Sequence, residues 1–480
     1  MYFNSLEFFI FFPLVFAFFW LIPKSSNTFR NGLLLAASYV FYGWWDWRFL
    51  SLIIISSFAD YFISQRMNDT LDEAKRKRFL WASLALNLGM LMYFKYANFF
   101  IDSFVDSFTF FGGELEASRL DIVLPVGISF YTFQTLSYTI DVYRRQLRPS
   151  RSIIDFFAYV SFFPQLVAGP IERATNLLPQ FKQEKVFNYS QAVGGCRQIL
   201  WGFFKKVVIA DNCAEIANNV FNNYESQPAS SLVLGSVMFA FQIYGDFSGY
   251  SDIAIGLSRL FGFNLKKNFA FPYFSRDIAE FWRRWHISLS TWFRDYLYIP
   301  LGGSKGGNWM RLRNTFIIFL VSGFWHGPKW TFVIWGAINA LLFIPLLLSN
   351  RNRNNLEIVP TKRLFPSLKD VFSILFTFSM VCLTWIFFRA ENVSDAFGYI
   401  TRIFDQSIFT LPRLELRYYF TFLFLILFVL IEWKNRTRNY ALEGMGEQRF
   451  ASLNVLAYTF LVLVIVIFAG NLQEFIYFQF

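Results

Sequence analysis

The chain has 480 residues, of which 55% are hydrophobic, 22% aromatic and only 16% charged. A soluble domain carries roughly 25% charged residues, so this composition excludes an ordinary soluble protein and favours one that lies in a lipid bilayer. The net charge of +11 does not indicate nucleic-acid binding, because the basic residues are spread over short connections between apolar runs, where membrane topology and anionic lipids favour them.

Five apolar runs predict membrane-spanning helices. Each approaches the roughly 20 residues that cross a bilayer. In chain order they are 8–22, 79–94, 372–388, 418–431 and 455–470. Helices are expected rather than a barrel, because no two-residue alternation is visible. The first run follows an acidic residue and precedes no small-residue cleavage site, so we expect a retained span and not a signal peptide.

Taken with the less regular segments between them, these runs predict an all-α, polytopic membrane protein. We expect about 11 spanning helices together with re-entrant and interfacial helices. No internal repeat and no long flexible linker interrupts the chain. A single continuous domain over residues 1–480 is therefore predicted.

The connections between the runs alternate in charge. Four of them are basic, namely 66–78, 144–151, 350–363 and 434–438. The connection at 102–119 is mainly acidic. The positive-inside rule predicts that the basic connections are cytoplasmic and that the N-terminus and residues 471–480 lie outside.

Three segments carry polar groups within or beside apolar stretches. Gln134, Ser137 and Asp141 are separated by three and four positions, so they share one face of a predicted helix. Gln165 stands between Pro164 and Pro170, which predicts a broken helix near membrane depth. Asp246 and Asp252 follow an apolar run among glycines, and they are either helix caps at a membrane-edge turn or part of a polar channel wall.

Two further segments are too charged for a plain span. Residues 196–212 combine Lys205 and Lys206 with an apolar face and resemble a helix in the membrane interface. Residues 281–300 interleave arginines with tryptophans, so this segment must face protein or a water-filled cavity.

The chain contains only two histidines, His286 and His326. His326 ends an apolar run, and Gly327 and Pro328 break the helix directly after it. A lone buried histidine is more often a satisfied core residue than a reagent. The helix break, the flanking tryptophans and the scarcity of histidine weaken that interpretation here, and an imidazole with a pKa near 6.5 is a suitable general base for a hydroxyl.

Several other chemistries find no support in the sequence. Two histidines cannot complete a tetrahedral metal site, and no acidic pair stands near either of them. Cys196, Cys213 and Cys382 have no metal or disulfide spacing and are expected to be buried small residues. The glycine-rich residues 300–308 lack the spacing of a nucleotide-binding loop and are expected to form a flexible loop.

Three motifs resemble the membrane-bound O-acyltransferase (MBOAT) superfamily, and most closely its bacterial alginate O-acetyltransferase branch. They are "DFSGYSDIAIGLSRLFGF" at 246–263, "FPYFSRDIAEFWRRWHISLSTWFRDYLYIPLGGS" at 271–304 and "FWHGPKWTFVIWG" at 324–336. The resemblance extends over essentially the whole chain. The D-alanyl transfer protein of teichoic acid modification shares "FWRRWH", but the continuation "YIPLGGSKGG" is closer to the acetyltransferase branch.

The resemblance implies a helical funnel or tunnel with His326 as the essential catalytic residue at its narrow centre and His286 as the second characteristic polar position. It implies no tightly bound cofactor. The donor would be a cytoplasmic acyl thioester, with acetyl-CoA as the expected one, and the acceptor an extracytoplasmic glycan or partner protein. Lining or substrate-binding roles are expected for six residues, Gln165, Asp246, Trp285, Trp325, Arg283 and Arg284. The two arginines, with Lys205 and Lys206, are candidates for the CoA phosphates, although ordinary cytoplasmic-face charge is the simpler interpretation.

Two other classes of function fit the same residues. Broken helices and buried polar groups are also typical of a transporter or flippase for a glycan or lipid. A structural scaffold for a secreted modifying enzyme would tolerate the loss of His326. The acceptor itself, whether alginate, peptidoglycan, cellulose or another surface glycan, stays open.

Overall fold

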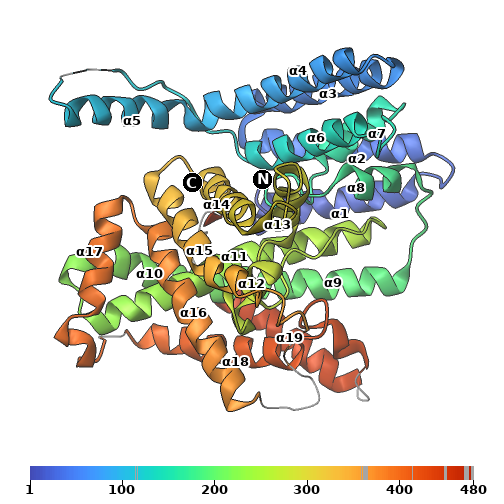
Figure 1. Cartoon of the computed structure of the whole chain (residues 1–480). Coiled ribbons are helices and arrows are strands. Elements are labelled where there is room, and N and C mark those ends of the chain that lie inside the picture. Colours follow the sequence, from blue (N-terminus) through green and yellow to red (C-terminus); the bar gives the residue numbers. More distant parts are fainter. Residues whose placement is uncertain are drawn as a thin grey trace. The chain divides into compact units, whose positions relative to one another are not determined.

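A computed structural model of the chain describes residues 1–113, 115, 117–357, 359, 366–412, 415–447, 451–469 and 475–476. Over these residues it contains helices and turns and no β-strand, as predicted (Figure 1). Parts of the connections 102–119 and 350–363 and most of 471–480 lie outside the described residues.

Four helical runs in the described part of the chain are long and apolar enough to cross a bilayer, at 27–69, 73–110, 330–348 and 368–389. The helices at Leu6–Leu21 and Ser452–Ile467 are apolar but shorter. Each of the five runs found in the sequence falls largely in helical structure. These runs support spanning helices without reaching the predicted count of about 11.

The chain divides into two compact units, residues 1–195 with 254–266, and residues 196–253 with 267–480. Two helices contribute residues to both units, α9 (Tyr189–Phe203) and α11 (Ala229–Leu260). The single continuous domain expected over residues 1–480 stays a prediction.

The first unit contains eight further helices among its described residues. They are α1 (Leu6–Leu21), α2 (Asn27–Asp46), α3 (Leu50–Asp69), α4 (Glu73–Leu91), α5 (Ala97–Phe110), α6 (Ile128–Tyr143), α7 (Ile153–Ser161) and α8 (Ala174–Lys182). Helix α4 continues through a π-helical turn into α5 (Figure 1). Helices α3, α4 and α6 pack together around Asp60, whose carboxylate accepts hydrogen bonds from Ser83 Oγ (2.5 Å) and Asn87 Nδ2 (2.8 Å).

The second unit contains nine further helices in the part that the structure describes. They are α10 (Asp211–Asn222), α12 (Ile278–Arg284), α13 (Ile287–Phe293), α14 (Gly307–His326), α15 (Trp330–Leu348), α16 (Leu368–Arg389), α17 (Val393–Ile403), α18 (Leu416–Lys434) and α19 (Ala451–Ile467). A π-helical turn at Phe204–Ala210 joins α9 to α10. Figure 1 shows α14, α15 and α16 as successive neighbours, in agreement with their packing contacts.

The hairpin of α14 and α15 depends on small residues. A Cβ atom on Gly323 would lie 2.2 Å from Phe332 O, and one on Gly336 would lie 2.3 Å from Phe319 O. The two backbones therefore touch where the helices cross, which is the common use of small residues between membrane helices. Helix α14 ends at His326, as the sequence predicted, and the Phe332 ring fills the space that a side chain at Gly327 would need.

Candidate active site

A cavity of about 580 Å³ lies in the second unit, and both histidines line it. Its walls come from α12, α13, α14 and α15 and from the connections that follow α13 and α15. Sequence reasoning left open whether the two histidines belong to the same site. The fold brings them together because the end of α14 and the junction of α12 with α13 face the same space.

One face of α14 forms a continuous wall of this cavity. Arg311, Thr315, Phe319, Ser322 and His326 all line it. They recur at intervals of three or four residues, so they lie in a stripe along the helix. Fifteen residues of α-helix separate Arg311 from His326, which corresponds to about 22 Å along the helix axis. The cavity therefore has a histidine end and an arginine end.

The His326 side chain is 4% exposed and is held among aromatic rings. Its ring centroid lies 5.0 Å from Trp325, 5.1 Å from Trp335 and 5.2 Å from Phe388, and all three pairs are edge-to-face. Helix α14 ends at this residue, and the helix break predicted from Gly327 and Pro328 follows it. The imidazole is thus placed at a helix end, among closely packed aromatic rings.

The His286 side chain is 1% exposed and lies where α12 gives way to α13. Its backbone is left-handed, with φ of +43° and ψ of +55°. The ring packs edge-on against Phe247, with centroids 4.6 Å apart, and lies 5.9 Å from the Trp325 ring. Trp325 therefore packs near both imidazoles.

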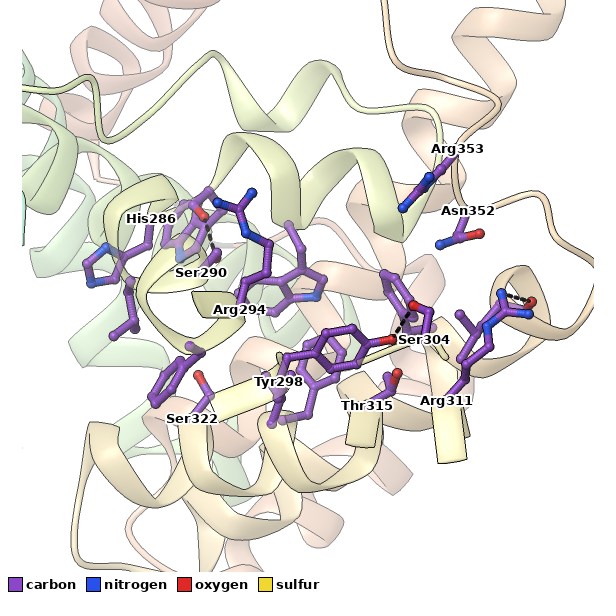
Figure 2. Close-up of a pocket in the computed structure, with 18 of the residues that line it drawn as sticks. His286, Ser290, Arg294, Tyr298, Ser304, Arg311, Thr315, Ser322, Asn352 and Arg353 are labelled. Atoms are coloured by element: carbon purple, nitrogen blue, oxygen red, sulfur yellow. Dashed lines mark hydrogen bonds between the residues drawn. The ribbon is translucent and has the colours of Figure 1, made fainter. Parts of the chain in front are cut away.

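The opposite end of the cavity is basic. Figure 2 shows His286 at one end of the pocket, Arg311, Asn352 and Arg353 at the other, and Arg294 between them. Arg294 is paired with Asp295, with Nε 2.6 Å from Oδ1. Among the described residues, no carboxylate lies within ion-pair distance of Arg311 or Arg353. This end is suited to an anionic group.

The structure distinguishes four of the residues for which a lining or substrate-binding role was expected. Trp285 lines the cavity, whereas Trp325, Arg283 and Arg284 are not among its lining residues. The Arg283 guanidinium donates to the carbonyls of Asn352 (2.7 Å) and Asn355 (2.9 Å). Arg284 is buried and donates to Glu280 Oε1 at 2.5 Å. Both arginines therefore form hydrogen bonds within the protein and do not face the cavity.

Asp246 belongs to a buried ion-pair cluster rather than to the wall of this cavity. Lys206 Nζ lies 2.8 Å from Asp246 Oδ1 and 2.9 Å from Asp211 Oδ1. Lys205 Nζ lies 2.5 Å from Asp252 Oδ2. The segment expected to lie in the membrane interface is helical, but both of its lysines are buried in these pairs and do not face solvent.

Gln165 lies in the first unit, in the turn that follows α7. It is buried, and its Nε2 donates to Tyr159 O at 3.4 Å. The helix break predicted at this position is confirmed, since α7 ends at Ser161. Gln165 does not line the cavity of the second unit.

The polar face predicted from Gln134, Ser137 and Asp141 also lies in the first unit. All three residues are buried on α6. None of them lines the cavity of the second unit.

The arginines at the basic end were missed by sequence reasoning, although the sequence carries a signal for one of them. Arg311 stands about four helical turns before His326 and on the same face, which helical phase alone could have indicated. Arg353 gave no such signal, because it comes from a connection that only the tertiary structure brings to α14. Arg294 lies in the segment 281–300, which was expected to face protein or a water-filled cavity, and it lines this cavity.

The described residues contain no group of three or more histidine, cysteine, aspartate or glutamate side chains that could hold a metal ion. Cys213 and Cys382 are buried as expected, whereas Cys196 is exposed on α9, so the prediction of three buried cysteines is wrong at this position.

Comparison with known proteins agrees with the motifs. Residues 33–388 match the model of the membrane-bound O-acyltransferase family. The chain is 41% identical to a probable alginate O-acetylase of Azotobacter vinelandii, over 85% of this chain and 78% of the relative. It is 35% identical to a peptidoglycan O-acetyltransferase of Helicobacter pylori, over 76% and 71% of the two chains. A teichoic acid D-alanyltransferase of Bacillus subtilis is 25% identical, over 56% of this chain and 70% of the relative.

Proposed function

Because the chain belongs to the membrane-bound O-acyltransferase family and is therefore a membrane acyltransferase, we propose that it transfers an acetyl group from acetyl-CoA to a hydroxyl of a surface polysaccharide. Alginate or a related glycan is the proposed acceptor class, since relatives at 35–41% identity are named for O-acetylation of alginate and peptidoglycan. The weaker similarity to the D-alanyltransferase makes an amino-acyl donor the alternative.

The observation that carries this proposal is the polarity of one cavity. Both histidines line it and have the Trp325 ring packed near them, and Figure 2 shows His286 at the end away from Arg311 and Arg353. Acetyl-CoA has a matching polarity, because its acyl carbon is separated from its phosphates by a long neutral arm. The stretch of roughly 22 Å of α14 between Arg311 and His326 leaves room for that arm along an apolar wall. The reacting carbon carries no charge, so an apolar surrounding admits it.

At the histidine end, His326 acts as the general base in this proposal. It removes the proton from the acceptor hydroxyl as the oxygen attacks the thioester carbonyl carbon. The carbon–sulfur bond then breaks, and the imidazolium returns the proton to the leaving thiolate. The products are an acetyl ester and free CoA, so protons balance without a metal or a tightly bound cofactor.

We place the chain in the bacterial cytoplasmic membrane as a multi-pass protein with about 11 spanning segments arranged as a funnel. The basic connection after α15 supports a cytoplasmic position for the arginine end. The donor would then enter from the cytoplasm, and the acetyl group would leave outward to the glycan or to a partner protein that carries it.

Substitution of His326 by alanine tests this function. We expect acetyl transfer to fall by about 10²–10⁴-fold, the usual contribution of a general base. The measurements are the O-acetyl content of the surface polysaccharide in cells and turnover of acetyl-CoA by the purified protein, with membrane insertion checked on the same samples. Unchanged O-acetylation by an inserted H326A variant would contradict the proposal and favour a scaffold. Loss of exported polymer, with its acetyl content per sugar preserved, would favour a transporter.

A further inference from the structure

Asn268 forms four hydrogen bonds with the segment that carries His286. Its side-chain Oδ1 lies 3.1 Å from His286 Nδ1, 3.2 Å from Ser288 N and 2.9 Å from Ser288 Oγ. Its backbone carbonyl accepts a hydrogen bond from Ile287 N at 2.8 Å. A single buried asparagine therefore braces the turn between α12 and α13, on which His286 stands.

These contacts decide which atom of the Asn268 amide faces His286. A backbone N–H can only donate, so the atom that Ser288 N contacts must be the amide oxygen. The amide nitrogen of Asn268 points the other way and donates to Ser251 Oγ on α11 at 3.1 Å. Both ends of the amide are thus assigned by their partners.

The orientation of the amide in turn decides the tautomer of His286. An amide oxygen only accepts, so the hydrogen bond at 3.1 Å requires a proton on His286 Nδ1. In the neutral ring the other nitrogen, Nε2, is then unprotonated and able to accept. His286 Nε2 is buried and has no hydrogen-bond partner among the described residues.

Asn268 also supports the backbone of His286, which is strained. A non-glycine residue in the left-handed region is energetically unfavourable, and such a conformation persists only where the surroundings hold it. The bonds from Asn268 hold both the backbone and the ring of this turn. The same residue therefore sets the position of the imidazole and the nitrogen that carries its proton.

We propose that Asn268 is a positioning residue of the transfer site, which keeps His286 protonated at Nδ1 and leaves Nε2 free to accept a hydrogen bond from a second hydroxyl of the glycan acceptor, next to the hydroxyl whose proton His326 removes. Its role in transfer rests on the function proposed above, whereas the tautomer of His286 does not. The two can therefore fail separately.

The scarcity of histidine makes the tautomer directly measurable. Protein labelled with ¹⁵N only in histidine gives signals from two imidazoles, and an H326A sample assigns those of His286. Solid-state ¹⁵N NMR distinguishes protonated from unprotonated ring nitrogens. We expect His286 to carry its proton on Nδ1 in the wild type and in N268D, since a carboxylate oxygen accepts the same bonds. In N268L, which has a similar shape but no acceptor, we expect the preference for Nδ1 to be lost.

A matched control and an activity measurement complete the test. N31L also removes a buried amide, one that donates to Asp155 and Phe181 in the first unit, and it should leave the His286 signals unchanged. Acetyl-CoA turnover should fall about 10- to 100-fold in N268L, the range seen when a supporting partner of a functional side chain is removed. It should be at least partly retained in N268D.

A proton on Nε2 of wild-type His286, or an unchanged Nδ1 preference in N268L, would overturn the proposal. If N268L does not fold, loss of the Nδ1 proton in N268D would overturn it and retention would support it. A wild-type protein with the expected tautomer but no acetyl transfer would count against the proposed function alone.

Discussion

At the scale of single residues, the chemistry of this protein depends on which charged groups are already paired. Lys205, Lys206 and Arg284 are buried, and the charge of each is neutralised by a carboxylate of the protein. Arg353 lies at the cavity and is exposed, with no carboxylate within ion-pair distance among the described residues. A group in this state can interact with a ligand without first losing an internal partner.

Substitution of Arg353 by alanine tests this assignment. We expect the KM for acetyl-CoA to rise about two- to fivefold, corresponding to about 0.5–1 kcal/mol for an exposed pair, with little change in kcat. S-acetyl-pantetheine lacks the nucleotide phosphates, so the difference between R353A and wild type should disappear with this donor. Steady-state kinetics on purified protein measure both.

The control for charge alone is R402A, because Arg402 lies on α17 and does not line the cavity. R402A should leave the KM for both donors unchanged. An equal effect of R353A on the two donors would show that Arg353 acts on something other than the phosphates.

At the scale of elements, the α14–α15 hairpin determines where His326 lies. The two backbones touch at Gly323 and Gly336, and His326 follows Gly323 by about one helical turn. Trp335, beside Gly336, packs on the His326 ring with centroids 5.1 Å apart. A change in the distance between α14 and α15 would therefore displace the His326 imidazole.

We predict that G336A separates these helices. The added methyl group would lie 2.3 Å from Phe319 O, which belongs to the backbone and cannot rotate away. Overpacking of this kind typically costs about 1–3 kcal/mol, and a displaced catalytic group loses about 10- to 100-fold in rate. The thermal unfolding midpoint in detergent and the acetyl-CoA turnover measure the two effects.

G89A is the matched control, because Gly89 is an exposed helical glycine on α4 with nothing within 4 Å of an added Cβ. It should be neutral or slightly stabilising, by at most about 1 kcal/mol. A stable and fully active G336A variant would show that the close approach of α14 and α15 is not needed.

At the scale of the whole molecule, orientation in the membrane decides which end of the cavity meets the donor. Charge alternation predicts that the connections at 66–78 and 350–363 are cytoplasmic and that residues 471–480 lie outside. Since Arg353 lies in the second of these connections, the arginine end would face the cytoplasm.

Tags inserted at Lys75 and Asn354 and after Phe480 test this topology. The tags at Lys75 and Asn354 should be accessible only after the inner membrane is opened, whereas the tag after Phe480 should be accessible from outside. Impermeant labelling of cells and of inverted vesicles measures the accessibility of each tag. Labelling of Asn354 and the C-terminal tag from the same side would contradict the topology.

The helical membrane class, the helix break after His326 and the family could all be predicted from the sequence. These depend on local properties, namely runs of apolar side chains, the stop imposed by Gly327 and Pro328, and contiguous motifs. Local patterns of this kind can be recognised in the sequence, because each involves residues that lie close together along the chain. The exposure of Cys196 and the burial of Lys205 and Lys206 could not be predicted from such local patterns.

Three features of the site could not be predicted without the folded chain: His286 and His326 line one cavity, its far end is basic, and Asn268 contacts His286. Each of these facts joins residues from different elements. Helical phase predicts which face of α14 carries Arg311 and His326, but not what packs against that face. Packing and pairing between elements depend on the path of the chain that connects them, and no local pattern encodes that path.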